Sequence, residues 1–148
     1  MIAIGCDHGG FVHKQAIMAY LKENNIEFKD YGTFTPDSVD YAPIAQKVCN
    51  TVVSGENEKG ILVCGTGIGM SIAANKIKGI RAAVCSDEFS CEFTRRHNDA
   101  NILCMGGRVV TEEQAIKLVS IFLNTEFEGG RHQRRIDQIA AIERGEQL

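Results

Sequence analysis

The chain has 148 residues, of which 44% are hydrophobic, and this length and apolar content predict one compact domain over 1–148. Its 16 Lys and Arg residues are matched by 19 Asp and Glu residues, so the basic excess typical of a nucleic-acid-binding protein is missing. The apolar stretches are too short to span a bilayer, and the start, Ile2-Ala3-Ile4, indicates a strand rather than a signal peptide. We therefore expect a cytoplasmic protein with no nucleic-acid or membrane partner.

The six cysteines are interpreted as reduced thiols. They lie mostly in apolar runs, and no two of them form a C-x-x-C pair. The chain also lacks the framework of a small secreted domain stabilised by disulfides, which agrees with a cytoplasmic protein.

Short apolar runs alternate with helix-like patterns along the chain, which is typical of a parallel α/β architecture. In chain order, the strands are predicted at about 1–6, 27–31, 60–64, 80–85 and 102–105. Helices are predicted between them at about 11–24, 43–54, 69–77 and 88–97. After the last strand, Thr111 and Gln114 have the spacing of a capping box, so a helix is expected to begin there. Its core-facing residues are expected to be Ala115, Leu118, Val119 and Phe122.

The C-terminal part of the chain departs from this alternation. Glu128-Gly129-Gly130-Arg131 interrupts the pattern, and a final helix is predicted over about 132–143. No strand follows this helix, although it carries an apolar stripe of Ile136, Ile139, Ala140 and Ile142. The pattern is equally consistent with packing on a partner subunit and with docking on the same domain.

The turns that follow the predicted strands form the candidate site, because ligands of open parallel sheets bind at the carboxyl ends of the strands. Four of these turns carry polar or glycine-rich sequences: Asp7-His8-Gly9-Gly10, Cys64-Gly65-Thr66-Gly67-Ile68-Gly69, Ser86-Asp87-Glu88 and Gly106-Gly107-Arg108. Glycine-rich turns backed by helix N-termini present backbone amides. We therefore expect a negatively charged ligand.

The glycine loop after Cys64 differs from the known nucleotide-binding motifs. Its glycines are spaced Gly-x-Gly-x-Gly rather than Gly-x-Gly-x-x-Gly, and the loop follows the third predicted strand instead of the first. It also lacks the Gly-Lys-Ser/Thr of a P-loop. A nucleotide cofactor is therefore not expected.

Cys64 itself has two interpretations. A cysteine at the end of a strand is most often a packing residue. Beside a helix N-terminus, however, a thiolate is favoured, and it can act as a nucleophile or as a proton-abstracting base. Thr66 can donate its hydroxyl to a substrate oxygen, and the amides of Gly65, Gly67 and Gly69 can face a developing enolate.

Asp7 and His8 are candidate ligands for a sugar hydroxyl and a phosphate, since both follow the first buried strand. The alternative is that Asp7 only caps a helix and that His8 is solvated. A metal site is not expected, because His8, His13, His97 and His132 contain no pair with the spacing of a zinc-binding helix.

Arg131 and Arg135 are candidate phosphate ligands. They are four residues apart, so a helix places them on one face, and Arg134 adds a third cation nearby. Arginine binds a phosphate dianion with two parallel hydrogen bonds. The alternative is a solvated basic face.

His97 and Asn98 pose a geometric problem. They precede the fifth predicted strand, so they belong to a helix-to-strand connection. Such connections lie at the opposite edge of the sheet from Cys64. If His97 and Cys64 serve one site, we expect a second subunit to supply one of them.

The chain resembles the sugar-phosphate isomerase family that contains ribose-5-phosphate isomerase B and the galactose-6-phosphate isomerase subunits. The resemblance covers essentially the whole length and is carried by Gly5-Cys6-Asp7-His8-Gly9-Gly10, Asp40-Tyr41, Cys64-Gly65-Thr66-Gly67-Ile68-Gly69, Ala73-Ala74-Asn75-Lys76, Arg95-Arg96-His97-Asn98, Gly106-Gly107-Arg108 and Gly129-Gly130-Arg131-His132. It implies a Rossmann-like three-layer sandwich with a five-stranded parallel sheet and an extra C-terminal helix. It also implies a homodimer, sometimes a tetramer, that isomerises ribose 5-phosphate and ribulose 5-phosphate without a metal or other cofactor.

The resemblance further implies roles for individual residues. Cys64 resembles the base that moves a proton between C2 and C1; some relatives place a glutamate further along the loop, where this chain reads Gly69-Met70-Ser71. His97 resembles the acid that assists ring opening. The implied substrate contacts are Asp7, His8, Gly65, Thr66, Gly67, Ile68, Gly69 and Asn98, and the implied phosphate ligands are Arg108, Arg131 and Arg135. The alternatives are isomerisation of a six-carbon sugar phosphate and a phosphosugar-binding module without turnover.

Overall fold

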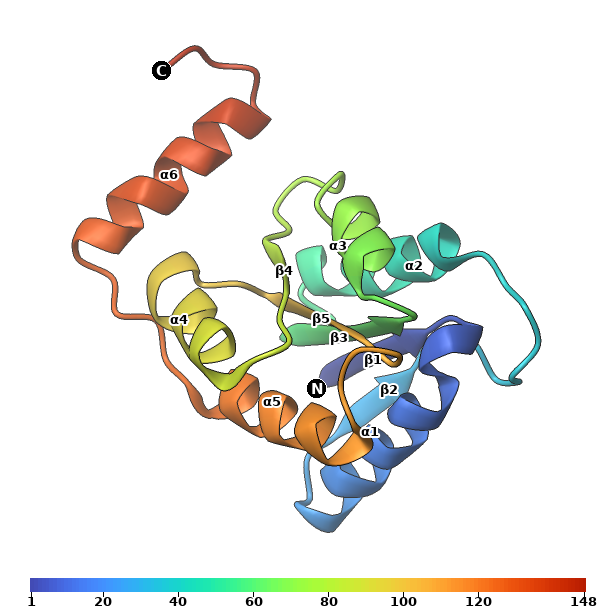
Figure 1. Cartoon of the computed structure of the whole chain (residues 1–148). Helices are drawn as coiled ribbons and strands as arrows, with labels where there is room; N and C mark the ends of the chain where they lie inside the picture. The colour runs from blue at the N-terminus through green and yellow to red at the C-terminus, as the bar shows by residue number, and fades with distance from the viewer.

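The computed structural model describes residues 1–148 and confirms the predicted alternation of strands and helices (Figure 1). The five strands are β1 (Ile2–Cys6), β2 (Phe28–Asp30), β3 (Lys59–Cys64), β4 (Ala82–Val84) and β5 (Ile102–Gly106). The helices are α1 (Phe11–Glu23), α2 (Tyr41–Val53), α3 (Ile68–Ala74), α4 (Glu88–Asn98), α5 (Glu112–Asn124) and α6 (Arg131–Glu143), with a short 3₁₀ helix η1 (His8–Gly10) before α1. Every helix falls short of the length and apolarity that a membrane span requires.

All strands of the sheet are parallel, in the order β2-β1-β3-β5-β4. Strands β1 and β5, which flank the central strand β3, are buried along their whole length, which explains why they are continuous apolar runs in the sequence. The register pairs Cys6 with Val63 and Cys64 with Gly106. The carboxyl ends of β1, β3 and β5 therefore lie side by side.

Helices cover both faces of the sheet, as the predicted three-layer sandwich requires (Figure 1). Successive side chains of a strand point to opposite faces. On β3, Ile61 and Val63 face a core shared with α1, α4 and α5, whereas Leu62 and Cys64 face a core shared with α2 and α3.

Helix α5 begins with half of the predicted capping box. The hydroxyl of Thr111 accepts the backbone N–H of Gln114 at 3.1 Å, as expected of an N-cap. The reciprocal bond was predicted wrongly, because Nε2 of Gln114 donates instead to the carbonyl oxygen of Ser86 at 2.8 Å. The side chain of Gln114, which the capping-box motif assigns to the start of α5, is thus bonded to the loop after β4 instead. The predicted core residues of α5 are buried: Ala115, Leu118, Val119 and Phe122.

Helix α6 extends away from the body of the chain and packs mainly against α4 (Figure 1). The side chains of Ile136 and Ala141 are buried, but Ile139 and Ile142 remain 50% and 60% exposed. Near the other end of the helix, the carboxylate of Glu143 accepts the N–H of Gly79 at 3.1 Å. The helix therefore docks on its own domain while half of its apolar stripe stays uncovered.

Candidate active site

The loops after β1, β3 and β5 touch one another and form a continuous floor at the carboxyl edge of the sheet. A Cβ atom on Gly9 would lie 2.8 Å from the backbone nitrogen of Gly65. A Cβ atom on Gly107 would lie 2.2 Å from the carbonyl oxygen of Gly9. Only glycine permits such close backbone approach, so three of the four turns predicted to form the site, those after β1, β3 and β5, are brought together.

Cys64 is the last residue of β3, and its side chain stands at the start of the glycine loop. Its Sγ accepts the N–H of Gly67 at 3.1 Å, and its carbonyl oxygen accepts the N–H of Gly107 at 2.8 Å. The residue is 4% exposed and contributes to the core under α2 and α3, so the packing role is real. The amide aimed at its sulfur is the kind of contact that stabilises negative charge there.

The remainder of the glycine loop presents polar and apolar groups to solvent. Thr66 and Ile68 are exposed, and the hydroxyl of Thr66 accepts the N–H of Ile68 at 3.2 Å. The ring of Tyr41, the first residue of α2, lies against Gly69. Tyr41 belongs to one of the sequence motifs but was not predicted as a site residue, and only its position after folding indicates that it borders the loop.

Asp7 and His8 are both held by backbone amides. One carboxylate oxygen of Asp7 accepts the N–H of Gly9 at 2.8 Å, which confirms the helix-capping interpretation of this residue. His8 is exposed, and its Nδ1 accepts the N–H of Val39 at 3.2 Å. In the neutral ring this contact leaves the proton on Nε2, so His8 offers a donor there.

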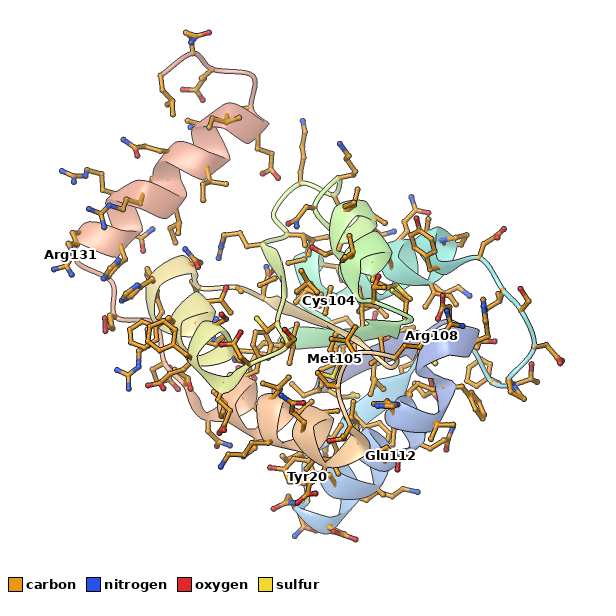
Figure 2. The ribbon with its side chains drawn as sticks, viewed as in Figure 1. Tyr20, Cys104, Met105, Arg108, Glu112 and Arg131 are labelled. Carbon is orange, nitrogen blue, oxygen red and sulfur yellow. The ribbon has the colours of Figure 1, made fainter.

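Arg108 lies on the same floor, in the loop after β5. Its backbone N–H donates to the carbonyl oxygen of Gly65 at 3.0 Å, and its guanidinium group lies against the same glycine. Figure 2 shows Arg108 at this edge of the molecule and Arg131 on the far side, at the start of α6. The predicted phosphate ligands Arg108 and Arg131 therefore do not meet within one chain.

His97 and Asn98 lie at the opposite edge of the sheet from Cys64, as predicted. Arg81 immediately precedes β4, and its Nε donates to the carbonyl oxygen of Asn98 at 3.0 Å. This bond fixes the end of α4 at the amino ends of β4 and β5. Cys64 pairs with Gly106 at the other end of β5, and four residue steps of about 3.3 Å each place the two edges about 13 Å apart.

His97 belongs to a separate cluster at the junction of α4 and α6. Its ring stacks on that of His132 with centroids 3.9 Å apart and an interplanar angle of 11°. Oε1 of Glu128 lies 3.5 Å from Nε2 of His97 and 3.7 Å from Nε2 of His132. Burial lowers the pKa of His132, and the neighbouring His97 and Arg131 lower it further, which favours the neutral ring.

Sequence reasoning assigned no role to Glu128 or His132. The two residues are four apart, but Gly129 and Gly130 stand between them and hide any helical periodicity. Arg131 and Arg135 are exposed on the first turns of α6, beside this cluster.

All six cysteines are free and buried, in agreement with the interpretation as reduced thiols. Burial raises the pKa of Cys6 to about 11 and that of Cys49 to about 12. It also raises the pKa of Cys104 well above the ordinary value. These three thiols stay protonated near neutral pH and serve as packing residues.

Comparison with known proteins identifies the chain as an enzyme of the aldose–ketose isomerase class. Residues 2–139 match the model of the family described as Ribose/Galactose Isomerase, and the chain belongs to that family. It is 50% identical to ribose-5-phosphate isomerase B of Escherichia coli K12 over 142 residues, which cover 96% of this chain and 95% of the relative.

Solved structures agree with this assignment. The ribose-5-phosphate isomerase B of Clostridium thermocellum superposes with a TM-score of 0.96, at 49% identity over 97% of each chain. The ribose-5-phosphate isomerase B of Mycoplasma genitalium, solved with bound ribulose-5-phosphate, gives a TM-score of 0.93 at 42% identity, over 97% of this chain and 95% of that chain. The predicted family and fold class are confirmed.

Proposed function

We propose that this chain interconverts ribose 5-phosphate and ribulose 5-phosphate as a metal-independent isomerase. The relative from Escherichia coli that is 50% identical is named ribose-5-phosphate isomerase B, and one similar structure, from Mycoplasma genitalium, holds ribulose-5-phosphate. The observation that carries the proposal is the thiol of Cys64, held by the Gly67 amide on a floor of three glycine loops. That floor combines a candidate base with donors for a sugar and its phosphate.

The reaction begins on the closed ring of the sugar phosphate. His97 donates a proton to the ring oxygen O4 as the C1–O4 bond of the furanose hemiacetal breaks, and the C1 hydroxyl releases its proton to water. The product is an open-chain aldehyde. A histidine suits this step because its two protonation states are both accessible near neutral pH.

Cys64 then moves the proton that defines the isomerisation. The thiolate takes the proton from C2, and the electrons of that C–H bond form the C1–C2 double bond of a cis-enediolate. A proton passes from the C2 hydroxyl to O1, and the proton held by Cys64 returns to C1, which leaves a hydroxyl at C1 and a ketone at C2. The hydroxyl of Thr66 and the amides of Gly65 and Gly69 stabilise the oxyanion, because donors fixed before the reaction lower the barrier most.

Contacts remote from C1 and C2 hold the substrate while the proton moves. Asp7, His8, Ile68 and Asn98 border the sugar, whereas Arg108, Arg131 and Arg135 bind the phosphate. The buried position of Asp7 and the Nε2–H of His8 fit these contacts.

The active site is shared between two copies of the chain. His97, Asn98, Arg131 and Arg135 come from one subunit, and Cys64, Thr66 and Arg108 come from the other. The separation of about 13 Å between the sheet edges supports this division. The exposed Ile139 and Ile142 of α6 supply apolar surface for a homodimer, which can pair further into a tetramer.

An assay of the purified chain with ribose 5-phosphate in the presence of a strong chelator tests activity, substrate and metal independence together. We expect ribulose 5-phosphate to form at the same rate with and without the chelator. Parallel kinetics with allose 6-phosphate and galactose 6-phosphate address the six-carbon alternative, since the family name covers galactose as well as ribose. A higher kcat/KM for a six-carbon substrate, or no turnover of any sugar phosphate, would contradict the proposal.

The sequence features also favour a cytoplasmic location and a single domain over the whole chain. Six free thiols are consistent with a reducing compartment. Fractionation of the native cells tests the location. We expect the protein in the cytoplasmic fraction, with six thiols that react with a thiol reagent after denaturation.

A further inference from the structure

Three metal-ligating side chains converge where α4 meets the start of α6. They are His97 from the last turn of α4, Glu128 from the segment after α5, and His132 from the first turn of α6. One ligand atom of each lies within 4.8 Å of the others. Two imidazole nitrogens and a carboxylate oxygen are a ligand set typical of zinc sites that keep a fourth position open.

The distances fit a shared metal better than they fit direct hydrogen bonds. Oε1 of Glu128 is 3.5 Å from Nε2 of His97 and 3.7 Å from Nε2 of His132. Both values exceed the usual hydrogen-bond range of about 2.7–3.2 Å. Two ligands on a tetrahedral zinc, with bonds of about 2.0–2.1 Å, stand about 3.3 Å apart. The stacked rings of His97 and His132 direct their lone pairs side by side, so His97 must rotate out of the stack before all three atoms can bind one ion.

The surrounding contacts hold the ligands in place and still leave room for this rotation. The ring of Phe93 packs edge-on against His97 at 4.9 Å, and the backbone N–H of Glu128 donates to the carbonyl oxygen of Arg96 at 3.0 Å. The side chains of His97 and Glu128 are 36% and 40% exposed, whereas that of His132 is 8% exposed. His132 thus provides a fixed ligand, and the other two can turn toward the ion.

Both cationic and anionic side chains surround the three ligands, and their balance determines how tightly a metal ion would bind. Arg131 and Arg135 lie on the same helix as His132, and these cations oppose a divalent ion. Arg96 is partly neutralised, because its Nε donates to Glu92 at 2.7 Å. We expect reversible binding of zinc rather than a permanently filled structural site.

We propose that His97, Glu128 and His132 form a Zn²⁺ site through which zinc inhibits the enzyme. Zinc bound at Nε2 of His97 occupies the lone pair that would otherwise carry the proton for ring opening. The inhibitory consequence rests on the proposed function of His97, whereas zinc binding does not. The ion is an inhibitor here and takes no part in the reaction.

Isothermal titration calorimetry of the full chain with zinc chloride, in a non-thiol reductant, tests the binding. We expect one zinc per chain, and at least a tenfold weaker affinity in Glu128→Gln and in His132→Gln. Glu126→Gln is the matched control, because it removes an exposed carboxylate two residues away and should bind zinc as the wild type does. Cys64→Ala should also keep full affinity, which separates this site from binding at the thiol.

Equal zinc affinity in all of these variants, or no zinc binding by the wild type, would overturn the site. Circular dichroism of each variant confirms folding, and the exposed Glu128 keeps the test informative even if the buried His132 variant unfolds. These outcomes do not depend on whether ribose 5-phosphate is the substrate.

The second measurement is the rate with ribose 5-phosphate as zinc is added and then removed by a chelator. We expect reversible inhibition of the wild type, and at least a tenfold higher zinc concentration for half-inhibition of Glu128→Gln, relative to its own uninhibited rate. Zinc that binds at the expected site without slowing an active enzyme would overturn the inhibitory mechanism. A chain that binds zinc as expected but isomerises no sugar phosphate would contradict the proposed function and leave the metal site standing.

Discussion

The floor of glycine loops around Cys64 and the cluster around His97 are built in opposite ways. At the floor, backbone contacts fix the chain so closely that a Cβ atom on Gly107 would lie 2.2 Å from a neighbouring carbonyl oxygen. At the cluster, side chains from α4 and α6 meet through ring stacking and the carboxylate of Glu128; Glu128 is exposed, His97 is half-buried and His132 is buried. The floor holds the candidate base and the cluster holds the candidate acid, so neither region of one chain contains a complete proton-transfer site.

This contrast indicates how each region is expected to respond to mutation. Changes at the floor should affect the chemical step, because the groups there are held rigidly against the substrate. Changes on the surface of α6 should affect substrate affinity and leave the fold unchanged, because the side chains are solvated on one side.

Replacing the thiol should have the largest effect. We expect Cys64→Ala to lower kcat by about 10²–10⁴-fold, which is the usual contribution of a general base, with circular dichroism like that of the wild type. The rate of ribulose 5-phosphate formation measures it. Cys49→Ala is the control, because Cys49 is a packing thiol and its loss should leave kcat unchanged. Near-normal turnover by Cys64→Ala would remove the thiol from the mechanism.

Mixing two inactive variants tests whether the two regions come from different subunits. After subunit exchange between Cys64→Ala and His97→Asn, half of the dimers contain one intact site out of two. We therefore expect about a quarter of the wild-type activity at equal mixing. Each variant mixed with itself should stay inactive.

The exchange must be verified independently, for example by native mass spectrometry of differently tagged subunits. If mixed dimers form and no activity returns, Cys64 and His97 do not serve a shared site.

Removing a phosphate ligand from α6 should have a smaller effect on activity than removing the thiol. Arg131→Gln should raise KM for the sugar phosphate by about 10–100-fold, because it removes a charge-assisted hydrogen bond to phosphate worth about 1.5–3 kcal/mol. Its melting temperature should equal that of the wild type, since Arg131 is exposed. Arg144→Gln, at the far end of the same helix, should change neither value. An unchanged KM in Arg131→Gln would argue for a solvated basic face.

The smallest effect concerns the start of α4, the helix that carries His97. Asp87 caps this helix by accepting the N–H of Ser90 at 2.7 Å, and that bond lowers the pKa of its carboxyl group. A lowered pKa in the folded state gives stability that is present above about pH 4 and lost as the carboxyl is protonated. Asp87→Ala should therefore lower the melting temperature slightly at pH 7.

The melting temperatures of Asp87→Ala and of the wild type should become equal as the pH falls below about 4. Thermal melts followed by circular dichroism measure both temperatures. Asp37→Ala, in an exposed loop, serves as the control and should melt like the wild type at both pH values. A difference in melting temperature between Asp87→Ala and the wild type that persists below about pH 4 would show that Asp87 stabilises the helix through something other than its charge.

Much of the fold follows from local signals in the sequence. The strands are predicted because buried parallel strands are continuous apolar runs, and Thr111 is predicted as a helix cap because its hydroxyl needs only a neighbouring amide. The limits of elements depend on more than local signals, and the helix predicted to start at about residue 43 starts two residues earlier. Helix α2 begins at Tyr41 and includes Pro43, since the first turn of a helix requires no N–H at that position.

The sequence by itself determined the order of strands and helices along the chain, the place of Cys64 at the end of β3, and the family motifs. Each depends on neighbours close in the chain. Tertiary structure alone decided that Gln114 bonds to Ser86 and that Glu128 lies between His97 and His132. It also decided that α6 leaves Ile139 and Ile142 uncovered. These contacts join distant segments, and their free energy depends on packing that no local periodicity encodes.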